Sequence, residues 1–137
     1  MSTAAGSDID IDIDIDDVLA SSIESLRRSG ATFGFLFGSH AAGTDRAGSD
    51  IDVAAFWATD PLASWEVPLD DQVDLLVLND APFELQGIVA TRGVLVFDDD
   101  PPTRVHWQAT TRKLYADERP RRERARREYL DAVAHGR

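Results

Sequence analysis

Cysteine is absent from the 137 residues, so disulfide frameworks, thiolate zinc sites and cysteine nucleophiles are all excluded. The sequence also lacks an apolar run long enough to span a bilayer. Its N-terminus is acidic where a secretory signal would be basic and then apolar. We therefore expect a cytoplasmic protein with no membrane contact, in which only oxygen or imidazole ligands are left for a metal ion.

The residues that are present fit one folded domain. The chain is 43% hydrophobic, which is enough to form a core, and 28% charged. This composition is not that of a wholly disordered or a fibrous protein. The length leaves no room for a second large domain.

Positive charge is scarce before the last part of the chain. Residues 1–37 hold 7 acidic and 2 basic side chains, and residues 38–100 hold 13 and 2. Residues 101–137 reverse the balance, with 5 acidic and 10 basic side chains. The acidic middle would repel nucleic acid and attract divalent cations, so we expect no direct nucleic-acid binding. The basic C-terminal part is the expected contact for an anionic partner or a nucleotide.

Residues 1–16 differ in composition from the rest, because aspartate and isoleucine alternate from Asp8 to Asp16. A period of two is typical of a strand, but five neighbouring aspartates would repel one another and aspartate disfavours strands. We therefore expect an acidic, solvated low-complexity tail over residues 1–16 and a folded domain over residues 17–137.

Helices and strands are predicted in turn along the folded part. Apolar residues at helical spacing predict a helix from about Asp17 to Gly30. Asn79 or Asp80 is expected to cap a second helix that ends at Gly93. Two further helices are expected near the C-terminus. Short β-prone runs predict four strands, the third buried on both faces: 32–37, 51–57, 72–78 and 93–97. This order predicts a small α/β or α+β sheet domain with a C-terminal helical pair.

The segment between the first two expected strands carries the residues that indicate chemistry. Gly38 and Ser39 close a strand at a tight turn, where backbone N–H groups and a hydroxyl can bind phosphate. Asp50 and Asp52 would leave the same face of a strand, with Cα atoms roughly 7 Å apart, and could share hard cations such as Mg²⁺. Asp74 lies within an apolar run, where a buried charge needs a metal ion or a base as its partner. If its strand lies beside that of Asp50, Asp74 completes the site.

These residues resemble the Gly-Ser-x10-Asp-x-Asp signature of the polymerase-β-like nucleotidyltransferase superfamily, in Gly38-Ser39 followed after ten residues by Asp50-Ile51-Asp52. Within it, the short chain resembles the minimal nucleotidyltransferases, in particular the MntA-type antitoxins paired with HEPN-domain toxins. The resemblance covers about residues 17–134, and it implies a small mixed sheet flanked by helices. The acidic residues 1–16 lie outside it.

The resemblance implies a protein adenylyltransferase that passes AMP from ATP to a tyrosine hydroxyl of the HEPN toxin, an RNase, and so neutralises it in a hetero-oligomeric complex. By position, Gly38 and Ser39 would hold the triphosphate. Asp50 and Asp52 would hold two magnesium ions, and Asp74 would be a third metal ligand and the candidate base for the incoming hydroxyl.

One departure from the family pattern concerns the residues after Ser39. Many relatives have an arginine there, and this chain has His40-Ala41-Ala42-Gly43 instead, with Arg46 as a possible substitute. Turnover is therefore expected to be slow, or the preferred nucleotide different. Two alternatives stay open, namely an antitoxin that acts by occlusion without catalysis, and a nucleotidyltransferase for an aminoglycoside-like drug. The arginines between Arg119 and Arg127 are either a solvated helix face or a docking surface for the toxin or its RNA.

Overall fold

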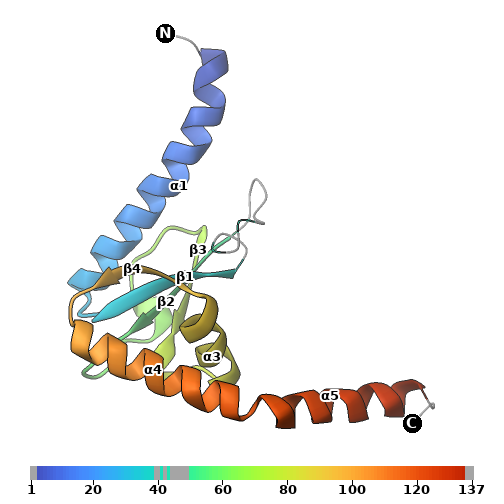
Figure 1. Cartoon of the computed structure of the whole chain (residues 1–137). Coiled ribbons are helices and arrows are strands. Elements are labelled where there is room, and N and C mark those ends of the chain that lie inside the picture. Colours follow the sequence, from blue (N-terminus) through green and yellow to red (C-terminus); the bar gives the residue numbers. More distant parts are fainter. Residues whose placement is uncertain (1–2, 39–40, 42, 44–49, 135–137) are drawn as a thin grey trace.

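The computed structural model describes residues 3–38, 41, 43 and 50–134 (Figure 1). Four helices and four strands make up this part of the chain. The helices are α1 (Thr3–Arg28), α3 (Phe83–Arg92), α4 (Pro101–Asp117) and α5 (Arg119–Ala134). The strands are β1 (Phe33–Phe37), β2 (Ile51–Phe56), β3 (Val73–Val77) and β4 (Val94–Asp98), with short 3₁₀ turns at η1 (Ser64–Glu66) and η2 (Leu78–Asp80).

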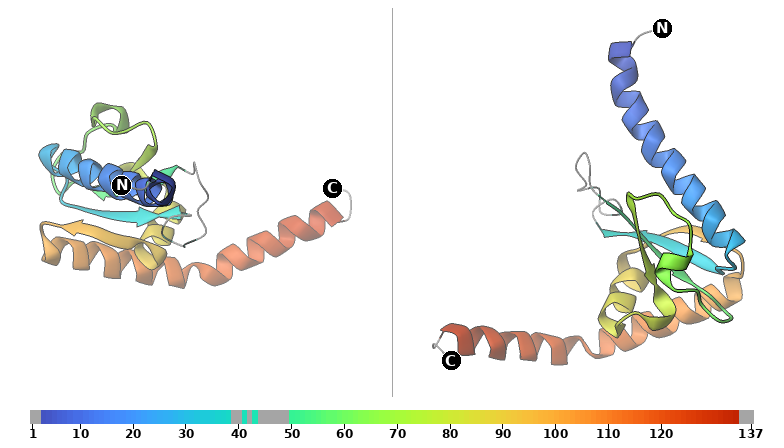
Figure 2. Two further views of the ribbon diagram at one scale, coloured as in Figure 1. Left: turned by 90° about the horizontal axis from the view of Figure 1, so that it is seen from above. Right: turned by 180° about the vertical axis from the view of Figure 1, so that it is seen from behind.

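The strands form one mixed sheet in the order β3-β2-β1-β4. Strand β1 is antiparallel to both of its neighbours, and β2 and β3 run parallel. Helix α1 lies on one face of the sheet, and α3 and α4 lie on the other (Figure 2). The predicted α+β class, with a small mixed sheet flanked by helices, is confirmed.

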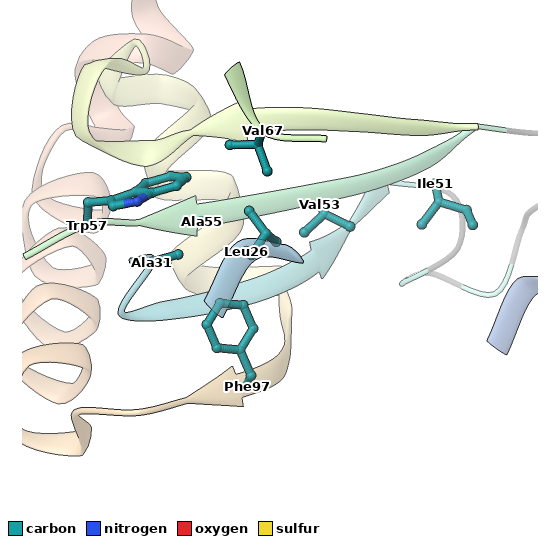
Figure 3. Close-up of a cluster of buried hydrophobic side chains, with 8 residues drawn as sticks. All are labelled: Leu26, Ala31, Ile51, Val53, Ala55, Trp57, Val67 and Phe97. Carbon is teal, nitrogen blue, oxygen red and sulfur yellow. The ribbon is translucent and has the colours of Figure 1, made fainter. Parts of the chain in front are cut away.

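Alternation along the strands divides the core into two clusters, because successive side chains point to opposite faces. On the α1 side, Leu26 packs against Val53 and Ala55 of β2 and Phe97 of β4 (Figure 3). On the other side, β1 supplies Phe33 and Phe35, which meet Ala54, Val89 of α3 and Trp107 of α4. The Phe33 ring stacks on Phe56 with 5.0 Å between centroids and lies 5.5 Å from Trp107. Burial on both faces therefore fixes β1 and β2 at the centre of the molecule.

Helix α1 begins much earlier than we predicted. The backbone of residues 3–16 continues the helix without a break, where we expected a strand-like pattern in a solvated tail. Contacts with the core involve Ile15, Val18, Leu19 and Ile23, and the N-terminal half extends beyond the sheet (Figure 1). Once these turns are packed, each added residue gains a hydrogen bond without a new nucleation step, which favours helix over strand. The division into a tail and a domain stays a prediction.

Strand β3 is not buried on both faces, and this prediction was wrong. It is the edge strand beside β2, and none of its five residues is fully buried. An edge strand has a neighbour on one side only, and the helices cover the central strands instead.

The helix after β3 is capped differently from the prediction. Pro82, not Asn79 or Asp80, is the N-cap of α3. Asn79 instead bridges to the end of β2: its Oδ1 accepts from the Trp57 backbone N–H at 3.0 Å, and its Nδ2 donates to the Trp57 carbonyl at 2.7 Å. The side chain is thus used to hold η2 against the sheet.

The C-terminal helical pair is present, but no residue of its second helix is buried against the domain. Helix α5 has no buried residue and leaves the rest of the molecule at the end of α4 (Figure 1). None of the helices in the described ranges is long and apolar enough to cross a membrane.

Candidate active site

Strand β1 ends at Phe37, and the next residue, Gly38, has a positive φ of 74°. A Cβ at this position would collide with the Asp52 carboxylate oxygen Oδ2. Phe37 pairs with Asp52 across the antiparallel β1 and β2, which explains why the next residue meets this carboxylate. Glycine is therefore required twice, for its backbone conformation and for the room that it leaves to Asp52.

Asp52 and Asp74 face each other across neighbouring strands. They are register partners in the parallel pair of β2 and β3, which places their Cα atoms about 5 Å apart. Asp52 is half-buried, and Asp74 is exposed at the sheet edge. The predicted neighbourhood of the two strands is confirmed, but Asp74 is not the buried charge that we expected, because β3 is an edge strand.

Asp50 precedes β2 by one residue and is exposed. It lies two positions before Asp52, so an extended backbone would direct both side chains to one face. Within the described ranges, no three His, Asp or Glu side chains are gathered closely enough to hold a metal ion by themselves. The donor set nevertheless fits magnesium, because this ion takes few protein oxygens and completes its shell with water and substrate phosphates.

One predicted site residue, Ser39, lies outside the described ranges. The same holds for His40 and Ala42, where the chain departs from the family pattern, and for Arg46, the proposed substitute for the family arginine. The structure thus brings together Gly38, Asp52 and Asp74, with Asp50 beside them in sequence, and leaves the phosphate-binding role of Ser39 as a prediction.

A groove next to Asp74 was not predicted. It has a volume of about 320 Å³ and is lined by Asp74, by Asp70 and Asp71 of the preceding loop, and by Trp65 of η1. Trp57 and Trp107 are in the core, whereas Trp65 is 86% exposed. The sequence feature that could have indicated this groove is the pair Asp70-Asp71, shortly before the strand that contains Asp74.

Solved structures similar to this chain come from toxin–antitoxin complexes. A toxin–antitoxin complex with AMP-PNP contains a chain with 28% identity and a TM-score of 0.66, and the match covers 79% of this chain and 94% of that one. The MntA–HepT toxin–antitoxin complex matches with 25% identity and a TM-score of 0.61, over 79% and 92% of the two chains.

A third similar structure is the tri-AMPylated HEPN toxin of Shewanella oneidensis in complex with its MNT antitoxin. It matches with 27% identity and a TM-score of 0.50, over 75% of this chain and 91% of that one. A search of curated protein sequences found no match.

The family model described as polymerase beta, nucleotidyltransferase, matches residues 23–102. This range is more than half of the chain and contains Gly38, Asp50, Asp52 and Asp74. It runs from the packed part of α1 to the start of α4 and so includes the whole sheet. The chain therefore belongs to the polymerase β nucleotidyltransferase family.

Proposed function

We propose that this protein is an antitoxin that acts as a magnesium-dependent adenylyltransferase, transferring AMP from ATP to a tyrosine hydroxyl of a HEPN-domain RNase toxin. The observation that carries the proposal is the pairing of Asp52 with Asp74 on adjacent strands, beside a Gly38 whose missing Cβ leaves room for the Asp52 carboxylate. Family membership supplies the reaction class, and the site residues supply the chemistry.

The partner and the nucleotide are proposed from the similar structures. One of them contains a toxin–antitoxin pair with AMP-PNP, and another contains a HEPN toxin that is tri-AMPylated and bound to an MNT antitoxin. Both share a quarter or more of their aligned residues with this chain over most of its length. ATP as the nucleotide and a HEPN toxin as the acceptor follow from this likeness.

In the proposed reaction, the tyrosine oxygen attacks the α-phosphorus of ATP. A bond forms between them, the bond from the α-phosphorus to the bridging oxygen breaks, and pyrophosphate leaves. The tyrosine proton passes to a carboxylate oxygen of Asp74. This role suits Asp74 because it is exposed at the sheet edge, where a hydroxyl on another protein can reach it.

The other residues of the site bind and orient. Gly38 and Ser39 hold the triphosphate through backbone N–H groups and a hydroxyl. Asp50, Asp52 and Asp74 would hold Mg²⁺, which, when bound, neutralises phosphate charge and steadies the attacking and leaving oxygens. Most of the rate enhancement would come from positioning and charge neutralisation.

The test is the intact mass of the HEPN-domain protein encoded beside this chain, after incubation with the purified chain, MgCl₂ and ATP. We expect its mass to increase in whole adenylyl units. The variant Asp50→Asn/Asp52→Asn should give no increase, while its circular dichroism spectrum stays that of the folded protein.

A matched control replaces two exposed carboxylates outside the site, in Asp16→Asn/Asp60→Asn, with the same change in charge. This control should transfer AMP like the original chain. Neutralisation of the toxin by the Asp50→Asn/Asp52→Asn variant, with no mass increase in any sample, would contradict the proposed transfer and favour occlusion.

A further inference from the structure

A hollow lies in the bend between α4 and α5. Its volume is about 880 Å³, and it lies on the concave side of the bend, against α3. The tightly packed contact beside it is that of Gly87 in α3 with the Tyr115 ring of α4, where a Cβ on Gly87 would overlap the ring. Helices α3 and α4 are thus closely packed where they form one wall of the hollow, and α5 forms the other.

Arg122 of α5 makes three contacts across the bend. Its guanidinium group lies over the Tyr115 ring, 3.7 Å from the centroid, and its Nη1 donates to the Tyr115 carbonyl at 2.8 Å. Its Nε is also 3.8 Å from Glu84 of α3. Stacking, a hydrogen bond and an ion pair on one side chain thus link α5 to α4 and α3 although no α5 residue is buried.

The remaining arginines give the hollow its charge. Arg112 donates to the Ala90 carbonyl, and Arg119 pairs with Glu123 at 3.0 Å. Arg92 and Arg126 also line the hollow, and within the described part of the chain neither forms an ion pair. Two cationic side chains are thus available to an incoming anionic group.

The lining also indicates which anionic group fits. Glu84 and Glu123 stand among the arginines, and Ile88, Ala116 and Ala125 add apolar surface. The carboxylates of the lining would repel closely spaced phosphates, and the net charge of −11 would also repel a nucleic acid. A polypeptide segment with spaced carboxylates and apolar side chains between them fits better, because its carboxylates can pair with the arginines and its apolar side chains can contact the apolar lining.

We infer that this arginine-lined hollow of Arg92, Arg112, Arg119, Arg122 and Arg126 docks an acidic, partly apolar segment of the protein that the candidate active site modifies. The inference rests on the proposed function, because it takes that acceptor protein as the partner. Helix α5 leaves the molecule on the side where β1 ends and β2 begins (Figures 1 and 2). A protein held in the hollow would therefore lie on the side of Gly38 and Asp52.

The experiment measures the affinity of the full chain for the HEPN-domain protein encoded beside it, by calorimetry without ATP. We expect the variant Arg92→Gln/Arg126→Gln to raise Kd about tenfold. The control Lys113→Gln/Arg124→Gln removes the same charge from exposed positions of α4 and α5 outside the hollow, and should leave Kd within about twofold. A labelled oligouridylate is the nucleic-acid probe, and we expect no binding.

The outcomes separate this inference from the proposed function. Three results would each overturn the docking site. The two variants could change Kd equally, the chain could fail to bind the HEPN protein, or the oligouridylate could bind in a way that depends on the arginines. If AMP transfer is observed, the Arg92→Gln/Arg126→Gln variant should raise KM for the toxin and leave kcat unchanged. Selective loss of affinity without any AMP transfer would support the docking site while contradicting the proposed catalysis.

Discussion

Two glycines near the candidate site have almost the same backbone conformation but different surroundings. The φ angles of Gly38 and Gly43 are 74° and 73°. A Cβ on Gly38 would collide with the Asp52 carboxylate, whereas a Cβ on Gly43 would meet no atom of the described residues within 4 Å. The pair therefore separates the cost of backbone strain from the cost of displacing a site residue.

We expect Gly38→Ala and Gly43→Ala each to lower the free energy of unfolding by about 1–2 kcal/mol, because alanine is strained at positive φ. Only Gly38→Ala should also reduce AMP transfer, by at least about tenfold, since Asp52 must move. Urea unfolding and the intact-mass assay measure the two effects. Equal transfer by the two variants would show that the Gly38–Asp52 contact has no part in the reaction.

Asn79 gives a second prediction at the scale of one residue. Its side chain satisfies both the N–H and the carbonyl of Trp57, and Trp57 is 1% exposed. Asn79→Ala leaves both backbone groups without these partners and should cost about 2–3 kcal/mol in urea unfolding. The neighbouring Asp80→Ala, at an exposed position of the same turn, should cost less than about 0.5 kcal/mol. Similar values for the two would contradict a structural role for the bridge.

At the scale of elements, the sequence predicted the strands better than the helices. Strands β1 and β2 follow from short runs of β-prone residues, and burial on both faces reinforces that signal. Strand β3 has an equally apolar run, but periodicity does not reveal that it lies at an edge. Asp74 was thus found for a reason that the structure contradicts: its charge is tolerated because it faces water.

Neither the early start of α1 nor the exposure of α5 could be predicted, for two different physical reasons. In α1 the alternation of Asp8 to Asp16 gives a period of two, yet the packed turns from Ile15 onward propagate a helix through it. In α5 the spacing of Ala125, Tyr129 and Val133 indicates an apolar face, yet Tyr129 is 68% exposed. Helical spacing predicts a helix, but it does not tell whether a surface exists to cover its face.

We expect the direction of α5 to depend on the contacts of Arg122, and distance measurements can test this. Because the chain has no cysteine, two introduced cysteines, Ser21→Cys on α1 and Glu128→Cys on α5, are the two positions that take a spin label. We expect one narrow distance distribution, and a much broader one after Arg122→Ala removes the contacts with Tyr115 and Glu84. Arg124→Ala on the same helix is the control and should keep the narrow distribution. An unchanged distribution in Arg122→Ala would mean that other contacts orient α5.

At the scale of the whole molecule, acidic and basic residues are concentrated in different parts of the chain. Acidic residues dominate residues 1–100, and basic residues dominate from residue 101 onward. The candidate site, with Asp50, Asp52 and Asp74, lies in the acidic part. The acidic part attracts cations to the carboxylates, and the basic part attracts an anionic surface of a partner. In the proposed function the two demands fall on separate elements, so that the proposed cation and the proposed partner protein would not compete for one surface.

This separation predicts a stabilising effect of magnesium that is distinct from the general effect of salt. Any salt should raise Tm by screening the repulsion of a chain with net charge −11. At equal ionic strength, MgCl₂ should raise Tm by about 4 °C more than NaCl, because an ion bound only by the folded state stabilises it. The difference should vanish in Asp52→Asn/Asp74→Asn and persist in Asp16→Asn/Asp60→Asn, which changes net charge equally. A magnesium effect that both pairs reduce alike would come from diffuse attraction to the acidic surface, and would leave the carboxylates of β2 and β3 without a role in metal binding.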